Sequence, residues 1–172
     1  GPYIVYWADH YDISVALLSG VLYDELTRTS RIYRLAEIPA AFFEMETSVG
    51  IASMKPATAK ILEDKGLVPA AGSNWERVWR LSDPKSAARY AAANLRSIAD
   101  ELATKGDPRL VTDEMIATNY SLSRVEPVTY RRGIEAIVSG RKLMLEVAER
   151  WRNDLFISEA IKRPWKTKVT LE

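Results

Sequence analysis

The stretch that ends at Glu25 places a carboxylate where an apolar residue is expected. Apolar side chains recur at steps of three and four along it, at Leu18, Val21 and Leu22. The next step lands on Glu25, on the same face of a helix. A half-buried glutamic acid that keeps its proton near neutral pH can protonate the leaving oxygen of a glycosidic bond. The spacing therefore makes Glu25 a candidate general acid/base.

An ordinary explanation of this glutamate is also open. An ionised carboxylate on a buried face is unfavourable unless it is paired, hydrogen-bonded or protonated. If the helix ended or rotated before Glu25, the carboxylate would lie in solvent or pair with Arg28, three residues later.

Other catalytic chemistries find little support in the residues. The chain has no Cys, so disulfides, thiol catalysis and thiolate metal sites are excluded. His10 is the only histidine, and without HExxH or GxSxG spacing neither a zinc hydrolase nor a Ser-His-Asp triad is indicated. The glycines lack the spacing of a phosphate-binding loop. We therefore expect neither a metal nor another cofactor.

Composition indicates one globular domain, which we place at residues 3–172. The chain has 172 residues and a net charge of +1, with 24 basic and 23 acidic residues, so no strong field favours nucleic acid. No apolar run is long enough to span a membrane. The opening Gly1-Pro2 resembles the remnant that a protease leaves on a recombinant protein, so a signal peptide or a larger parent protein would leave no trace.

Helical signals dominate the chain, which predicts an all-α fold, or nearly so. Asp12 is the expected cap of a first helix that ends near Arg28. Further helices are expected over residues 55–66, in one turn at 75–79, after Asp83-Pro84, over 112–122 and over 129–157. Residues 29–48 are expected to form a loop with a short helical turn.

The segment that follows the Glu25 helix, SVGIASMKPATAKIL (48–62), carries a family resemblance. It is similar to the lysozyme-like superfamily, and within it to soluble lytic transglycosylases and goose-type lysozymes. Those proteins follow a catalytic Glu helix with a Ser-x-Gly-hydrophobic-x-Gln segment and then a Pro-x-Thr-Ala helix start. The matching residues are Ser48, Gly50, Ile51, Pro56, Thr58 and Ala59. Residues 81–102 and 116–122 resemble two later family segments, so the likeness covers about 11–125 in the right order.

Three positions depart from the family pattern. Leu26 stands where the family has Ser after the catalytic Glu, and Ser53 stands where a sugar-contacting Gln is usual. Ser121 replaces the Asn that follows the groove tyrosine, Tyr120, although Asn119 precedes it. Residues 126–172 match only as a closing helix.

The resemblance implies a lysozyme-like helical domain with a central catalytic-Glu helix and an added long C-terminal helix. It implies cleavage of the MurNAc-β-1,4-GlcNAc bond of peptidoglycan, as a lytic transglycosylase with Glu25 as the single acid/base. A hydrolysing relative would add a second carboxylate, for which Glu46 is a better candidate than Glu44. The substrate-binding residues implied are Ser48, Gly50, Ser53, Met54, Asn119 and Tyr120.

Peptidoglycan strands are the partner that this resemblance implies, together with a possible cognate inhibitor or larger parent protein. The expected location is extracytoplasmic: the periplasm, the cell surface, or secretion as an effector. Two alternatives stay open. One is a non-catalytic glycan-binding or protein-interaction module that keeps the fold, and the other is a chitinase-like lysozyme relative.

Overall fold

The computed structural model describes residues 2–28, 47–105 and 111–122, and the regular elements in these ranges are all α-helices. They are α1 (Pro2–His10), α2 (Val15–Arg28), α4 (Pro56–Asp64), α5 (Asn74–Ser82), α6 (Pro84–Lys105) and α7 (Asp113–Leu122). In the same ranges, extended backbone pairs only at an isolated antiparallel bridge between Val49 and Met54. The all-α prediction is confirmed for this part of the chain. The helix predicted over 129–157 and all but the last two residues of the loop predicted over 29–48 lie outside the described residues.

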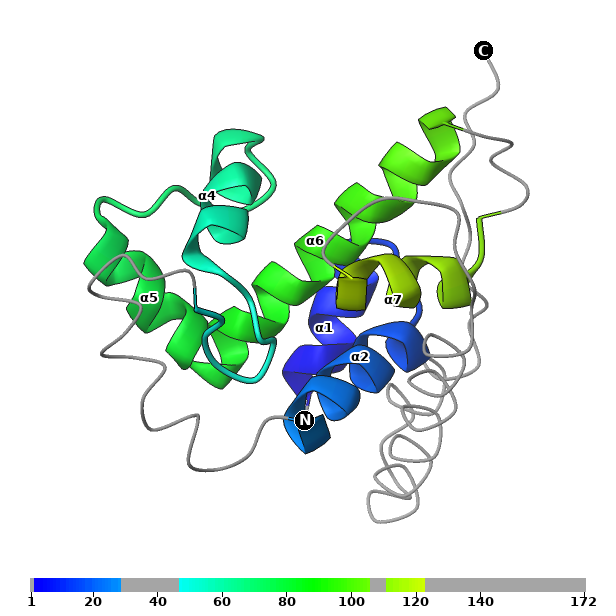
Figure 1. Cartoon of the computed structure of the whole chain (residues 1–172), viewed down its shortest axis with the longest axis horizontal. Helices are drawn as coiled ribbons and strands as arrows, with labels where there is room; N and C mark the ends of the chain where they lie inside the picture. The colour runs from blue at the N-terminus through cyan, green and yellow to red at the C-terminus, as the bar shows by residue number, and fades with distance from the viewer. Residues whose placement is uncertain (1, 29–46, 106–110, 123–172) are drawn as a thin grey trace.

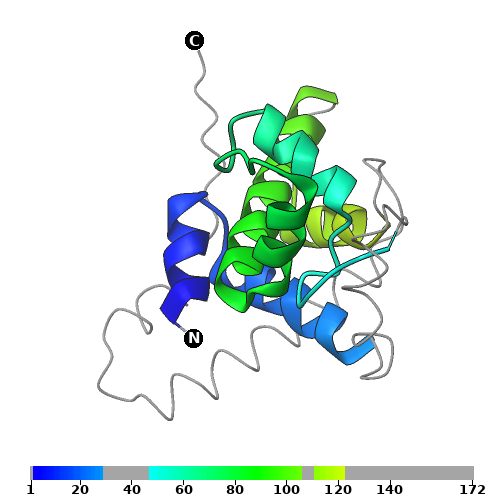
Figure 2. The same cartoon turned by 90° about the vertical axis from the view of Figure 1, so that its left-hand side faces the viewer.

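Helix α6 runs through the middle of the described structure, with the other helices around it (Figures 1 and 2). It packs against α1, α2, α4, α5 and α7. Its buried face is rich in alanine, whose small side chain lets neighbouring helices approach closely; these residues are Ala87, Ala88, Ala91, Ala92, Ala93 and Ala99. We expected the helix that carries Glu25 to be central. Instead, α2 packs beside α1, α6 and α7, and α6 is the central helix.

The start of the chain differs from the prediction. Helix α1 was not predicted. Only two of its nine residues, Val5 and Ala8, are buried. Two buried residues give too weak a helical periodicity to be recognised in the sequence. Asp12 does not cap α2: it lies in the turn after α1 with φ +53°. Ser14 caps α2 instead, because its hydroxyl accepts a hydrogen bond from the amide of Leu17 at 2.9 Å.

Local signals place the ends of α4 and α7 as expected. Pro56 occupies the first turn of α4. After α4, Gly66 adopts φ +70° and its amide donates to the carbonyl of Glu63, which ends the helix. Thr112 caps α7, because its hydroxyl accepts from the amide of Met115 at 3.3 Å.

Helices α5 and α6 follow one another with a cap at each start. Ser73 caps α5, because its hydroxyl accepts a hydrogen bond from the amide of Glu76 at 3.1 Å. The helix runs to Ser82 and is longer than the single turn predicted at 75–79. Asp83 accepts from the amide of Ser86 at 2.8 Å, and Pro84 then opens α6 as predicted.

A buried polar cluster joins α4, α5 and α6. Arg77 donates to both oxygens of Glu63, with the shortest contact, from Nη2 to Oε2, at 2.8 Å. The hydroxyl of Tyr90 and the amide of Ala71 also donate to the Glu63 carboxylate, at 2.7 and 3.1 Å. Burial opposes ionisation of Glu63, but these hydrogen bonds and the Arg77 charge outweigh it and hold its pKa below the ordinary value. The cluster fixes α4 against α6, and those two helices form the walls of a pocket.

Candidate functional site

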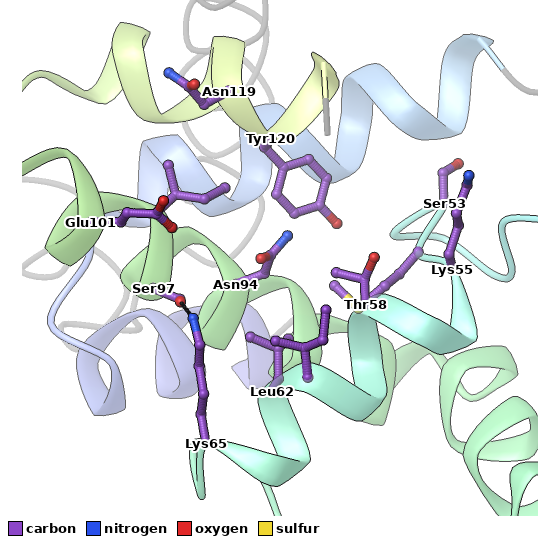
Figure 3. A pocket seen from close by; sticks show the side chains of 13 residues that line it. Ser53, Lys55, Thr58, Leu62, Lys65, Asn94, Ser97, Glu101, Asn119 and Tyr120 are labelled. Carbon is purple, nitrogen blue, oxygen red and sulfur yellow. Dashed lines mark hydrogen bonds between the residues drawn. The ribbon is translucent and has the colours of Figure 1, made fainter. Parts of the chain in front are cut away.

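A pocket of about 230 Å³ lies between α4, α6 and α7. The α4 wall is made by Thr58, Ile61, Leu62 and Lys65, and the α6 wall by Asn94, Ser97, Ile98 and Glu101. Both sets follow the same spacing of three, four and seven residues, so each is one helical face. Figure 3 shows Tyr120 of α7 in the centre, between these walls, with Ser53 and Lys55 at one end and Lys65 near the other.

The segment that leads into α4 forms one edge of this pocket. The amide and carbonyl of Val49 pair with those of Met54, at 2.9 and 3.2 Å, and a tight turn closes between them. Ser53 takes φ +43° in that turn and donates its amide to the carbonyl of Gly50 at 3.1 Å. This turn brings Ser53 and Met54 to the pocket wall.

Gly50 has a packing reason to be glycine. Its φ is +72°, and a Cβ built on it would lie 2.0 Å from the carbonyl oxygen of Leu81 in α5. No side chain fits there. Gly50 lies against Leu81 of α5 and is not among the residues that line this pocket.

Tyr120 connects this segment with the helix that carries Glu25. The tyrosine is buried, and its hydroxyl donates to the carbonyl of Ala52 at 2.7 Å. Burial raises the pKa of Tyr120 far above its ordinary value, and the negative charge of Glu25 raises it further. The Glu25 carboxylate therefore lies close enough to this phenol to act on its ionisation.

Glu25 itself is half-buried in the last two turns of α2. The helix continues past it to Arg28, so the explanation in which the helix ends before Glu25 is wrong. Glu25 is not one of the described residues that line the pocket. The charge of Glu25 acts on Tyr120, and Tyr120 does line the pocket.

The other predicted site residues are only partly brought together. Ser53, Met54, Asn119 and Tyr120 line the pocket, whereas Ser48, like Gly50, does not. Asn119 is almost fully buried, and its side-chain amide donates to the carbonyl of Met115 at 2.8 Å. In Figure 3 it points away from Tyr120. Glu46 and Glu44 lie outside the described residues.

Most of the polar residues of the two pocket walls are not among the predicted site residues. Asn94, Ser97 and Lys65 were not predicted as site residues, and Thr58 was noted only as part of the Pro-x-Thr-Ala match. A signal did exist, because polar residues share a face with Leu62 on α4 and with Ile98 on α6. That two such faces meet is decided by the packing of α4 on α6.

Several other features lie apart from the pocket. Trp75 and Trp79 are 56% and 50% exposed on α5, with their rings edge to face at 5.8 Å. Within the described ranges, no three His, Asp or Glu side chains lie together as metal ligands would. No helix in this part of the chain is both long and apolar enough to cross a membrane.

Comparisons of the chain with protein-family models, with curated proteins and with solved structures gave no match. The lysozyme-like resemblance therefore rests on its four sequence segments, and its functional content is a proposal.

Proposed function

We propose that this chain cleaves the MurNAc-β-1,4-GlcNAc bond of peptidoglycan as a lytic transglycosylase, with Glu25 as the single general acid/base. The proposal includes a lysozyme-like arrangement of its helices and an extracytoplasmic place of action, where such strands occur.

One observation supports the proposal: Glu25 is half-buried, and its charge acts on the phenol of Tyr120, a residue that lines the pocket. Four segments supply this neighbourhood, namely α2, residues 48–62 with the turn and α4, α6, and α7. The family resemblance puts the same four in the same order. A carboxyl group near a pocket can transfer a proton to and from a bound substrate.

The reaction needs one carboxyl group acting twice. Protonated Glu25 gives its proton to the glycosidic oxygen as the bond from C1 of MurNAc to that oxygen breaks, and the GlcNAc leaves with a free 4-hydroxyl. The 6-hydroxyl of the same MurNAc then attacks C1, and Glu25 accepts the proton that this oxygen loses. The product carries a 1,6-anhydro bond, no water is consumed, and Glu25 returns to its protonated form.

Tyr120 would act as a positioning residue in this scheme. Its hydroxyl is committed to the carbonyl of Ala52, which ties α7 to the turn that carries Ser53. Its ring lies in the middle of the pocket lining, although little of it is exposed, so it shapes the pocket rather than stacking on a sugar.

Digestion of purified peptidoglycan by the wild-type chain and by Glu25→Gln tests the proposal, with soluble products read by mass spectrometry. We expect products ending in 1,6-anhydro-muramic acid from the wild type and a loss of at least about a hundredfold in the variant, the usual scale for a general acid/base. Unchanged release by Glu25→Gln would contradict it. Reducing-end products would indicate hydrolysis instead, and would direct attention to Glu46 as the second carboxylate.

A non-catalytic glycan-binding module is the second candidate. It is favoured by one specific observation, that Glu25 does not line the pocket directly. It also fits the replacement of the family's Gln and Ser by Ser53 and Leu26. Wall binding without release of products by the wild type would support this candidate.

A further inference from the structure

Lys65 lies at one end of the pocket, where its ammonium is hydrogen-bonded to a hydroxyl and, among the described residues, not to a carboxylate. Its ammonium donates to the hydroxyl of Ser97 at 3.0 Å, which links the end of α4 to α6 (Figure 3). In the described structure no carboxylate pairs with it. Lys60, one turn earlier, pairs with Asp64 at 2.7 Å.

Two polar side chains beside Lys65 have no hydrogen-bond partner among the described residues. They are the amide of Asn94, which is one turn before Ser97 on α6, and the hydroxyl of Thr58 on α4. Both line the pocket, and Figure 3 shows them facing its interior below the ring of Tyr120. A half-buried amide without a protein partner is a group that a ligand can satisfy.

The charge of the pocket lining is positive. Two lysines, Lys55 and Lys65, line it against one glutamate, Glu101, so the lining carries +1. The Glu101 carboxylate is itself paired with Lys105 at 2.6 Å. An anion that entered this end of the pocket would meet an unneutralised ammonium.

We propose that Lys65, with Ser97 and Asn94, forms a subsite for a carboxylate carried by the glycan. The ammonium, the hydroxyl and the amide NH2 are hydrogen-bond donors, and a carboxylate accepts from all three. This inference rests on the proposed function for the nature of the chain that bears the carboxylate. It narrows the substrate to strands with anionic substituents and disfavours neutral GlcNAc polymers.

Two sources can supply such a carboxylate. One is the lactyl group of muramic acid on strands from which the peptide has been removed, because removal frees that acid. The other is the peptide stem, which carries its own carboxylates where the lactyl group is amidated. Either the lactyl carboxylate or a carboxylate of the peptide stem can occupy the subsite, and the experiment below distinguishes the two sources.

Calorimetric binding in the Glu25→Gln background tests the subsite, because this background prevents turnover. The ligands are peptide-free glycan strands, stem-bearing strands and the neutral chitotetraose. Lys65→Met should weaken binding of one or both anionic ligands by about tenfold or more, the scale of a charge-assisted hydrogen bond. The binding of chitotetraose should not change. Loss with peptide-free strands alone identifies the lactyl acid, and loss with stem-bearing strands alone identifies the stem.

Lys60→Met is the matched control, because it removes an equal charge from α4 outside the pocket. Equal losses for Lys60→Met and Lys65→Met, a loss that includes chitotetraose, or no loss at all would each overturn the subsite. Failure of the proposed cleavage would look different: anionic strands would bind through Lys65, but the wild type would release no products. Absence of binding to any anionic strand would overturn both proposals.

Discussion

Glu25 and Glu63 are both glutamates on helices, and their surroundings differ. Glu63 is nearly fully buried, and Arg77, Tyr90 and the amide of Ala71 donate to it. With its oxygens occupied in this way, it is a structural group. Glu25 is only half-buried, and its charge acts on the phenol of Tyr120, which lines a pocket. Under the proposed function, Glu25 is the group that meets the substrate.

Glu63→Gln should lower the free energy of unfolding by about 3 kcal/mol, because it leaves Arg77 buried without its counter-charge. Urea denaturation at neutral pH measures this loss. The matched control is Lys60→Met, which breaks the exposed Lys60–Asp64 pair and should cost less than about 1 kcal/mol. Similar losses for the two variants would show that the buried cluster contributes no more than a surface pair.

The same glutamate predicts a pH dependence. The pKa of Glu63 is lowered in the folded state from an ordinary value of 4.5. The unfolded chain then binds more protons in that range, so stability rises with pH there. The contribution of Glu63 is fully present above 4.5 and is lost as the pH falls through the folded pKa. The stability difference between wild type and Glu63→Gln should therefore shrink below that pH, and a constant difference would contradict the assignment.

At the scale of elements, two glycines with almost the same backbone have different reasons to be glycine. Gly50 and Gly66 have φ +72° and +70°. A Cβ at Gly66 would meet nothing within 4 Å, so this glycine serves only to end α4. At Gly50 the same Cβ would collide with the carbonyl of Leu81, so this glycine also lets the Val49–Met54 turn press against α5.

Alanine substitution separates these two reasons. Gly66→Ala should cost about 1 kcal/mol, the strain of a left-handed residue with a side chain. Gly50→Ala should cost about 2 kcal/mol more than that, because the collision is with backbone that cannot rotate away. Urea denaturation of both variants gives the comparison. Equal costs would mean that the turn shifts freely away from α5.

At the scale of the whole molecule, α6 connects every other described helix. Its alanine face touches helices on several sides, and Ala92 has no exposed surface. A larger side chain at this position has no open side into which it can move. We therefore expect damage there to reach both the pocket walls and the α2–α7 contact.

Ala92→Leu should destabilise the protein by about 2 kcal/mol or more, the cost of overpacking a filled core. Ala57→Leu adds the same atoms to an exposed site on α4 and should stay within about 0.5 kcal/mol of the wild type. Thermal or urea unfolding followed by circular dichroism measures both. A neutral Ala92→Leu would mean that α6 is not closely packed on that side.

The sequence by itself determined what depends on neighbouring residues. Pro56 marks the start of α4 and Gly66 follows its end. Asp83 caps the start of α6, and Thr112 caps the start of α7. These signals can be found in the sequence because caps and turns act over three or four residues. The step of three and four also placed Glu25 on a helix, and the absence of Cys excluded thiol chemistry.

Only the tertiary structure decided what depends on residues far apart in the chain. It paired Glu63 with Arg77, set Gly50 against Leu81, and joined Lys65 to Ser97, 32 positions away. No periodicity within one helix encodes which faces meet, because that choice is made by the fit of side chains between helices. For this reason the helix that carries Glu25 could be predicted from the chain alone, whereas the pocket between α4, α6 and α7 could not.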